Sequence, residues 1–443
     1  MTFNITKFFL NSRIIGLLGF LSVLTFSFSL KAQDAAPAVT PEVAYIFNTF
    51  LFLVSGFLVM FMAAGFCMLE AGQVRSKNTA VICLKNIGLF SIAGVMYYLV
   101  GYNLMYDGVD GGYLGSFSLF DRNSEADIET GYAAASDWYF QMVFVATAAS
   151  IVSGALAERI LIWPFFLFVA ILTGFIYPIA GSWQWGGGWL SEAGFSDFAG
   201  STLVHSVGGW AALTGAIILG AREGKFSDNG TSNMLPGCSL PLTTLGVFIL
   251  WLGWFGFNGG SQLALGSGAD ATAVADIFVN TNLAAAGGVL ACMIVSKLTN
   301  SHTNIAATLN GAIAGLVAIT AEPLTPSMGE AIFIGAVGGL ICMYGMKLLD
   351  MLKIDDVVGA IPAHLFAGIW GTLIVPFTNS DTSYGVQLLG VVSYGIFTVI
   401  VTFILWFVIK SVIGIRASKE DEEYGLDMSE LGVLSHPDFT DKK

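Results

Sequence analysis

The segment DFAGSTLVHSVGG, residues 197–209, and the distant segment DVVGAIPAHLFAG, residues 356–368, share the spacing D-x2-G-x4-H-x3-G. Each opens an apolar stretch and places a histidine about two helical turns inside it. An ionisable residue inside a membrane segment indicates a functional site, and a repeated one indicates two structural repeats that share the site. The alternative is that each aspartate caps a helix and each histidine is a satisfied core residue. The matched spacing favours the shared site.

The composition is typical of a helical membrane protein. Hydrophobic residues make up 55% of the 443 residues and charged residues 11%, whereas soluble domains carry about 25% charged residues. Glycine is abundant, with 53 residues, which suits close helix packing in lipid. The net charge of −13 argues against a nucleic-acid partner. The sequence has no metal-ligand cluster, phosphate loop or nucleophile with an adjacent base, so we expect no metal, no cofactor and no enzymatic activity.

Three regions follow from the order of apolar and polar stretches. Residues 1–33 are predicted to be a cleaved signal peptide, because a basic start precedes an apolar core and a Pro/Ala-rich stretch. Residues 34–413 form the transmembrane domain, and residues 414–443 a cytoplasmic tail. Eleven apolar runs of about 20 residues are predicted to span the membrane. These runs are 43–69, 80–103, 138–157, 160–182, 203–221, 239–261, 273–296, 304–320, 329–349, 357–376 and 386–413.

The loops between these runs predict the orientation of the chain. Lysine and arginine fall almost entirely on one alternating set of loops, so the mature N-terminus should lie outside and the C-terminus in the cytoplasm. The longest outer loop, residues 106–137, is rich in acidic residues and holds only Arg122 as a base. Such a loop would raise the local concentration of cations, although an ordinary solvated loop would have the same composition.

The two motifs then run in opposite directions across the membrane. Asp197 leads the fifth helix inward, and Asp356 leads the tenth helix outward. The predicted fold is therefore an all-α polytopic membrane protein of eleven helices, with an inverted 5+5 repeat plus one helix. His205 and His364 would meet near mid-membrane, where burial disfavours the charged form. Two neutral imidazoles suit the passage of a small hydrogen-bonding molecule, or relay of a proton, without attracting potassium or sodium.

The chain resembles the Amt/Mep/Rh family of ammonium transporters and ammonia channels, in its bacterial Amt form, over essentially the whole mature length. DFAGSTLVHSVGG is similar to the family signature around its first pore histidine. Five further stretches support the resemblance: VRSKN (74–78), GALAER (154–159), WGGGWL (185–190), GWFGFNGGS (253–261) and FVNT (278–281). The resemblance implies a homotrimer with one pore per subunit in the bacterial inner membrane, and ammonium or its analogue methylammonium as substrate.

The resemblance also implies roles for individual residues. Phe144, Trp185 and Ser261 are similar to the site that recruits the cation outside, and Phe144 with Phe257 to the paired gate below it. His205 and His364 are similar to the twin pore histidines, with Thr281 as a further pore-lining group. Asp197 is similar to the buried carboxylate that organises the recruitment site. From the residues alone, each aromatic side chain would more simply be packing against lipid or core.

The second motif departs from the family pattern. Gly359 stands where the family commonly has an aspartate, and Pro362 lies two residues before His364 and is expected to kink the helix. Asp355 and Asp356 most simply cap the tenth helix or pair with nearby lysines.

The tail is similar to the family's regulatory C-terminal segment, which couples subunits and contacts a PII-type regulator. The matching tail residues are Gly414, Arg416, Gly425, Leu426 and Asp427. A solvated acidic tail is the alternative.

The predicted function is that of an ammonium transporter that recruits ammonium outside, deprotonates it and conducts ammonia past the twin histidines. Net conduction of ammonia and transport coupled to a relayed proton both fit the motif. An ammonium sensor or receptor on the same fold is one alternative, although the tail of about 30 residues offers no room for a signalling domain. A Rh-like channel for a neutral gas is another, but it would not need the aromatic recruitment residues.

Overall fold

The structure is a computed structural model, and it describes residues 39–122 and 130–437. The predicted signal peptide, residues 1–33, lies outside the described residues. Pro41 opens the first described helix, a few residues after the predicted start of the transmembrane domain.

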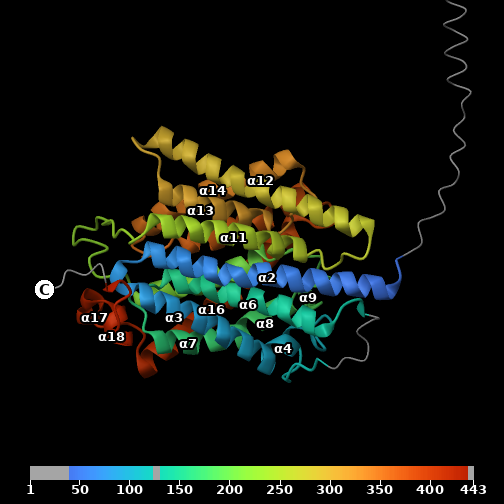
Figure 1. The fold of residues 1–443 in the computed structure, drawn as a ribbon, viewed down its shortest axis with the longest axis horizontal. Helices are drawn as coiled ribbons and strands as arrows, with labels where there is room; N and C mark the ends of the chain where they lie inside the picture. Colours follow the sequence, from blue (N-terminus) through green and yellow to red (C-terminus); the bar gives the residue numbers. More distant parts are fainter. Residues whose placement is uncertain (1–38, 123–129, 438–443) are drawn as a thin grey trace, which may run out of the picture. The chain divides into compact units, whose positions relative to one another are not determined.

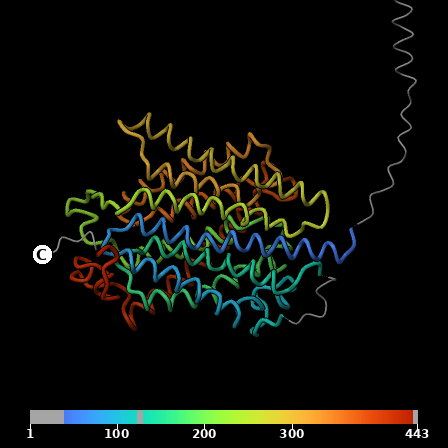
Figure 2. Tube along the Cα trace, in the orientation of Figure 1, coloured from blue at the N-terminus to red at the C-terminus, as the bar shows by residue number. Residues whose placement is uncertain are grey.

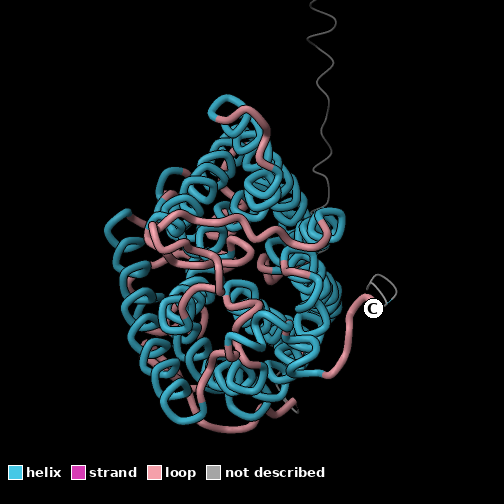
Figure 3. The backbone as a smooth tube through the Cα atoms, turned by 90° about the vertical axis from the view of Figure 1, so that its left-hand side faces the viewer, coloured by secondary structure: helices cyan, strands magenta, loops and turns pink. Residues whose placement is uncertain are grey.

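The described chain is helical, with two isolated β-bridges at Ile160–Arg416 and Phe226–Ser232. Figure 3 shows the helices seen nearly end-on, with loops running across the end that faces the viewer. The first half comprises α2 (Pro41–Gln73), η1 (Ser76–Asn78), α3 (Thr79–Met96), η2 (Tyr97–Gly101), α4 (Tyr102–Tyr106), α6 (Ala134–Ala155), α7 (Ile162–Ile171), η3 (Leu172–Ile176), α8 (Tyr177–Ser182), α9 (Trp189–Glu192), η4 (Ser201–Ser206) and α10 (Val207–Leu219).

The second half also consists of long helices and ends in a short helical tail. It comprises α11 (Leu240–Gly260), α12 (Gly268–Thr299), α13 (Ile305–Ile319), α14 (Met328–Met351), η5 (Ile361–Phe366), α15 (Ala367–Leu373), η6 (Val375–Phe377), α16 (Tyr384–Ile413), α17 (Lys419–Tyr424) and α18 (Leu426–Leu431).

Among the described residues, nine helical segments are long and apolar enough to cross a membrane, which makes this a multi-pass membrane protein. Two further predicted spans, 304–320 and 357–376, correspond to shorter apolar helices, Ile305–Ile319 and Ile361–Phe377. The nine segments are Pro41–Gln73, Ser76–Tyr106, Ala134–Ala155, Ile162–Ser182, Ser201–Leu219, Leu240–Gly260, Gly268–Thr299, Met328–Met351 and Tyr384–Ile413.

The first helices of the two halves, α2 and α11, pack side by side near the middle of Figure 1. Glycine makes this packing close, because a Cβ atom at Gly72 or Gly246 would overlap the backbone of the other helix. On one side α12, α13 and α14 pack on one another, and on the other α6 joins α2 to α3. The same course can be followed along the chain in Figure 2.

The start of α2 and the tail lie at opposite ends of the helices in Figure 1, where α17 and α18 are at the left and the start of α2 at the right. Several long helices begin at a serine whose hydroxyl accepts a hydrogen bond from the first turn, as at Ser239, Ser267 and Ser383. At α14 the cap is a full capping box between Ser327 and Glu330.

Candidate functional site

The first motif begins with a buried aspartate that caps a helix. The carboxylate of Asp197 accepts four backbone hydrogen bonds of 2.8–3.0 Å, from the N–H groups of Gly200, Ser201, Thr202 and Leu203. Gly200 has a φ of 104°, a left-handed conformation that favours glycine. The segment that follows, η4, is a π-helical turn, a form often found at functional sites.

The second motif is built in the same way. The Asp356 carboxylate accepts hydrogen bonds from the N–H groups of Gly359 and Ile361, and Gly359 has a φ of 76°. The following segment, η5, is again a π-helical turn. Pro362 stands in its first turn, where the missing N–H removes no helical bond, so the proline begins this segment and does not interrupt it. The capping alternative therefore describes both aspartates correctly.

The last glycine of each motif lets the two segments cross closely. A Cβ atom at Gly209 would overlap Leu365 of η5, and one at Gly368 would overlap the carbonyl oxygen of Ser201 of η4. Each motif therefore packs against the other at the last glycine of its shared spacing.

This crossing brings the two histidines together. His205 and His364 are buried, and their Nδ1 atoms lie 3.2 Å apart. One Nδ1 must donate and the other accept, so the two rings hold complementary tautomers when both are neutral. The Nε2 atom of His205 has no hydrogen-bond partner among the described residues, so this atom is available to a small polar molecule.

A line of aromatic rings leads from the histidines toward the end of the helices that the loops predict to be the outer one. Phe257 lies 5.3 Å from His205 between ring centroids, and Phe144 stacks on Phe257 at 4.0 Å. Trp185 meets Phe144 edge-on at 5.8 Å. The predicted gate and the predicted histidines therefore form one continuous column.

The column opens into an outer pocket of about 530 Å³, which is lined by Phe144, Trp185 and Ser261 among others. The Trp185 indole N–H donates to the carbonyl oxygen of Asp197 at 2.9 Å, which fixes the ring over the pocket. The Ser261 hydroxyl donates to the carbonyl of Phe257 at 2.8 Å, so its oxygen lone pairs remain able to accept a hydrogen from a ligand. The structure thus brings the three predicted recruitment residues together.

Two residues that the sequence reasoning missed belong to this arrangement. Trp254 stacks on His205 at 5.0 Å and anchors its indole N–H on Thr320. Asp137, which the sequence predicts to be the last residue of the acidic outer loop, lies in the first turn of α6 and lines the outer pocket. Its carboxylate accepts a hydrogen bond of 2.6 Å from the Tyr102 hydroxyl.

Thr281, predicted to line the pore, is buried and bonds to a neighbour of the column. Its hydroxyl accepts a hydrogen bond of 3.0 Å from the side-chain amide of Asn258, the neighbour of Phe257 in the sequence. This contact supports the backbone that carries the Phe257 ring.

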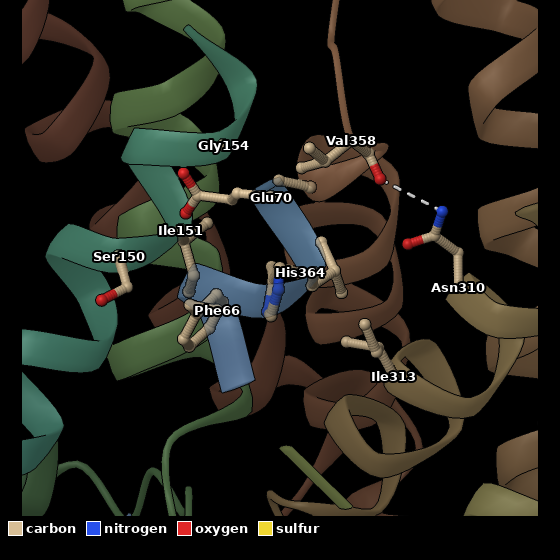
Figure 4. A pocket seen from close by; sticks show the side chains of 11 residues that line it. Phe66, Glu70, Ser150, Ile151, Gly154, Asn310, Ile313, Val358 and His364 are labelled. Carbon is tan, nitrogen blue, oxygen red and sulfur yellow. Dashed lines mark hydrogen bonds between the residues drawn. The ribbon is translucent and has the colours of Figure 1, made fainter. Parts of the chain in front are cut away.

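On the other side of the histidines, His364 borders an inner cavity together with Phe66, Glu70 and Asn310 (Figure 4). The space open to the centre of a water-sized molecule is about 10 Å³, enough for one water or ammonia. Asn310 donates to the carbonyl of Val358 at 3.1 Å, and both residues also line a wider vestibule of about 160 Å³. In the described part of the chain no three His, Cys, Asp or Glu side chains gather as a metal site would require.

The end of the molecule that carries the tail is held by a charge network. Glu158 accepts hydrogen bonds from Arg75 and forms an ion pair with Arg222, and Arg222 holds the Asp355 carboxylate through two guanidinium hydrogen bonds of 2.8 and 2.9 Å. Asp355 therefore pairs with an arginine, and the predicted lysine partner was wrong. Burial alone would raise the pKa of Asp355, but Arg222 and Arg159 more than offset it, so this pKa lies well below its usual value.

Three of the five tail residues, Arg416, Leu426 and Asp427, make hydrogen bonds to other segments of the chain. Arg416 donates to the carbonyl of Leu219 and pairs with Glu422, while Gly414 and Gly425 have positive φ angles. The Leu426 N–H donates to the Asn78 side chain, and the Asp427 carboxylate accepts from the N–H of Val81. The tail as far as the structure describes it, to residue 437, is therefore docked on the segment 76–81 and is not a freely solvated acidic stretch.

Comparison with known proteins shows to which family this chain belongs. Residues 50–434 match the Ammonium Transporter Family. The chain belongs to this family of ammonium transporters. Members of this family are not enzymes.

Similar proteins include a putative ammonium transporter of Synechocystis, 42% identical over 91% of this chain and 92% of that one. Ammonium transporter Amt2 of Archaeoglobus fulgidus is 40% identical over 87% of each chain.

Among solved structures, one titled Sensor Amt Protein superposes on this ammonium transporter family member with a TM-score of 0.84. It is 33% identical and covers 88% of this chain and all of that one. Candida albicans Mep2 matches with a TM-score of 0.77 and 26% identity, over 89% of this chain and 91% of its own.

Proposed function

We propose that this protein is an ammonium transporter in which ammonium is recruited at the outer pocket, loses a proton at the ring column, and crosses as ammonia past His205 and His364. The observation that carries the proposal is the unbroken contact from Trp185 through Phe144 and Phe257 to the two imidazoles.

The outer pocket suits a compact cation. Ammonium against the aromatic faces of Trp185 and Phe144 gains about 0.5–2 kcal/mol by cation–π attraction. The lone pairs of Ser261 accept one N–H, and the Asp137 carboxylate adds negative charge to the same pocket. Potassium would receive similar attraction there, so selectivity must arise further in.

The ring column supplies that selectivity. Phe144 and Phe257, stacked at 4.0 Å, leave no hydrated path for an ion. Moving a bare ion into such apolar surroundings costs far more free energy than moving its neutral base. Only a cation that can release a proton therefore passes. Beyond the rings, the two imidazoles offer hydrogen bonds to ammonia and a route for a proton.

We further propose the topology that the loops indicate. The eleven helices, including the two shorter ones, cross the bacterial inner membrane after removal of the signal peptide, with the mature N-terminus outside. Residues 34–413 form the transmembrane domain of inverted halves, and residues 414–443 the cytoplasmic regulatory tail. The assembly is a homotrimer, and the docked tail is the surface that a PII-type regulator would contact.

A sensor or receptor function is the second candidate, because the sensor Amt structure superposes along its whole length. The two functions differ in flux: a transporter moves many ammonium equivalents for each protein molecule, whereas a sensor need only bind. The intact recruitment pocket argues against a channel for neutral gas.

The test is a current and uptake measurement on the full chain in liposomes, with pulses of ammonium, methylammonium and potassium. We expect saturable uptake of methylammonium that ammonium competes for, and no response to potassium. Binding of ammonium without uptake would favour the sensor, and uptake that never saturates would favour the gas channel.

A further inference from the structure

Glu70 of α2 is a buried carboxylate at the inner end of the pore with one oxygen unused. Its Oε2 atom accepts a hydrogen bond of 2.7 Å from the Ser153 hydroxyl. Its Oε1 atom has no hydrogen-bond partner among the described residues, although the Asn86 amide lies nearby. Three other buried glutamates engage both oxygens: those of Glu158 bond to Arg75, those of Glu322 to a backbone turn and to Asn379, and those of Glu422 to the N–H of Glu223 and, as an ion pair, to Arg416.

A buried lysine compensates the charge of this carboxylate. Lys85 of α3 is fully buried, donates to the carbonyl of Ser153 at 2.8 Å and lies 5.0 Å from the centre of the Phe165 ring. Glu70 and Lys85 are thus joined through the two polar groups of Ser153. Such a pair can hold one negative and one positive charge in a dry place, and breaking it by removing one partner would be costly.

Glu70 and His364 line the same small cavity. Figure 4 shows both side chains at this cavity, with the Phe66 ring beside His364 and Asn310 on the right of the view. One water-sized molecule fits in this cavity, whose wall both residues help to form, and we take that molecule as the link between the imidazole and the carboxylate. A carboxylate that retains a free lone pair in such a place is suited to accept a proton and give it back.

We propose, on the basis of the function above, that Glu70 is the inner proton-exchange group of the transport cycle. A proton released from ammonium at the outer pocket passes through the His205–His364 pair, and through the one molecule in the cavity, to Glu70 Oε1. The carboxylate becomes a carboxylic acid. When ammonia arrives, its lone pair takes this proton: the O–H bond breaks, an N–H bond forms, and the carboxylate is restored.

The product of this step is ammonium, which can leave through the wider vestibule. Asn310 and Val358 form the border between the cavity and the wider vestibule, which Asp350, Asp356 and Lys225 also line. Ammonium formed at Glu70 is therefore next to a hydrated, partly acidic exit. Each cycle moves one ammonia and one proton, so the transported unit carries one positive charge.

The test compares charge with substrate in the same liposomes. Integrated current and uptake of labelled methylammonium are measured for the full-length wild type and for Glu70→Gln, which keeps the size and hydrogen bonds of the side chain but cannot exchange the proton. We expect the charge moved per methylammonium to fall about 10²-fold, the scale of a lost acid–base group. Methylammonium uptake itself should persist as the neutral amine.

The matched control is Glu322→Gln, the same change at a buried glutamate that lines neither cavity, and its charge per methylammonium should equal that of the wild type. Because Glu70→Gln leaves Lys85 uncompensated, the double variant Glu70→Gln/Lys85→Met is measured as well. It removes both charges, and the same loss of charge per methylammonium is expected.

Two results distinguish failure of the proposed transport function from failure of the role proposed for Glu70. If the wild type takes up no methylammonium, the proposed transport function fails and this inference with it. If the wild type transports but both Glu70 variants keep the wild-type ratio of charge to methylammonium, or a folded variant loses current and uptake together, the role of Glu70 is overturned and transport stands.

Discussion

Replacing Asp197 by alanine should be among the most destabilising single changes in this protein. The carboxylate satisfies four buried N–H groups at the start of η4. Each buried donor left unpaired costs about 1–3 kcal/mol, so the loss is about 4 kcal/mol even at the low end of that range. Asp197→Asn keeps one acceptor oxygen and should lose about half as much.

Asp356 supplies a matched comparison within the same chain. Its carboxylate holds two N–H groups, so Asp356→Ala should cost about half of what Asp197→Ala does. Asp350 pairs with Lys225 at a half-exposed position, and Asp350→Ala should cost about 0–1 kcal/mol.

Thermal unfolding of the detergent-solubilised variants, followed by size exclusion, gives the order of stability. The expected order of destabilisation is Asp197→Ala, then Asp356→Ala, then Asp350→Ala. Asp197→Ala could unfold at the same temperature as the wild type, or the Asp356→Ala and Asp197→Ala variants could be equally destabilised. Either result would show that these carboxylates do not stabilise the starts of η4 and η5 to the extent expected.

Four further outcomes are expected. Trp185→Leu should weaken apparent ammonium affinity without loss of folding, because an aliphatic side chain offers no ring face; unchanged competition by methylammonium would remove Trp185 from recruitment. His205→Asp should lose discrimination against potassium, whereas His205→Ala should mainly lose ammonium-driven current; wild-type currents and potassium exclusion in both would refute the twin-histidine route. Native mass spectrometry in mild detergent should show a trimer, and a fully active monomer would contradict it. The pKa of Asp355 is depressed in the folded protein, so its pairing with Arg222 stabilises the protein above the ordinary aspartate pKa. Thermal stability should therefore fall on acidification below about pH 4, and Asp355→Asn should flatten that fall; an equally steep fall in the variant would count against the pairing.

The spacing of the two motifs predicted much of the central geometry. A shared offset between Asp, Gly and His is visible in the sequence because each position has a separate physical requirement: a cap, a left-handed turn and a ring two turns further on. The contact between His205 and His364 followed from reading the motifs as inverted partners. The recruitment residues came from the resemblance, since no periodicity distinguishes Trp185 from an aromatic residue that packs against lipid.

Other residues could not be found in this way, because their roles depend on contacts between distant segments. In the sequence, Glu70 stands near the end of an apolar run that predicts a helix. Only the folded structure brings it beside His364 and Ser153. Trp254 lies in an apolar run where any large side chain would fit the pattern. Asp137 sits at a helix start that the sequence leaves within an acidic loop.

The reciprocal glycine crossing limits how this protein could be re-engineered for other amines. At Gly209 and Gly368 the two segments approach each other closely, and this approach sets the separation of the two imidazoles. Substituting nearby side chains would therefore change that separation little. Enlarging the passage at that level would require moving two helices at once. A design that aims at bulkier substrates should therefore start with the exchangeable rings of Phe144 and Phe257, whose volume can be altered without shifting the main chain.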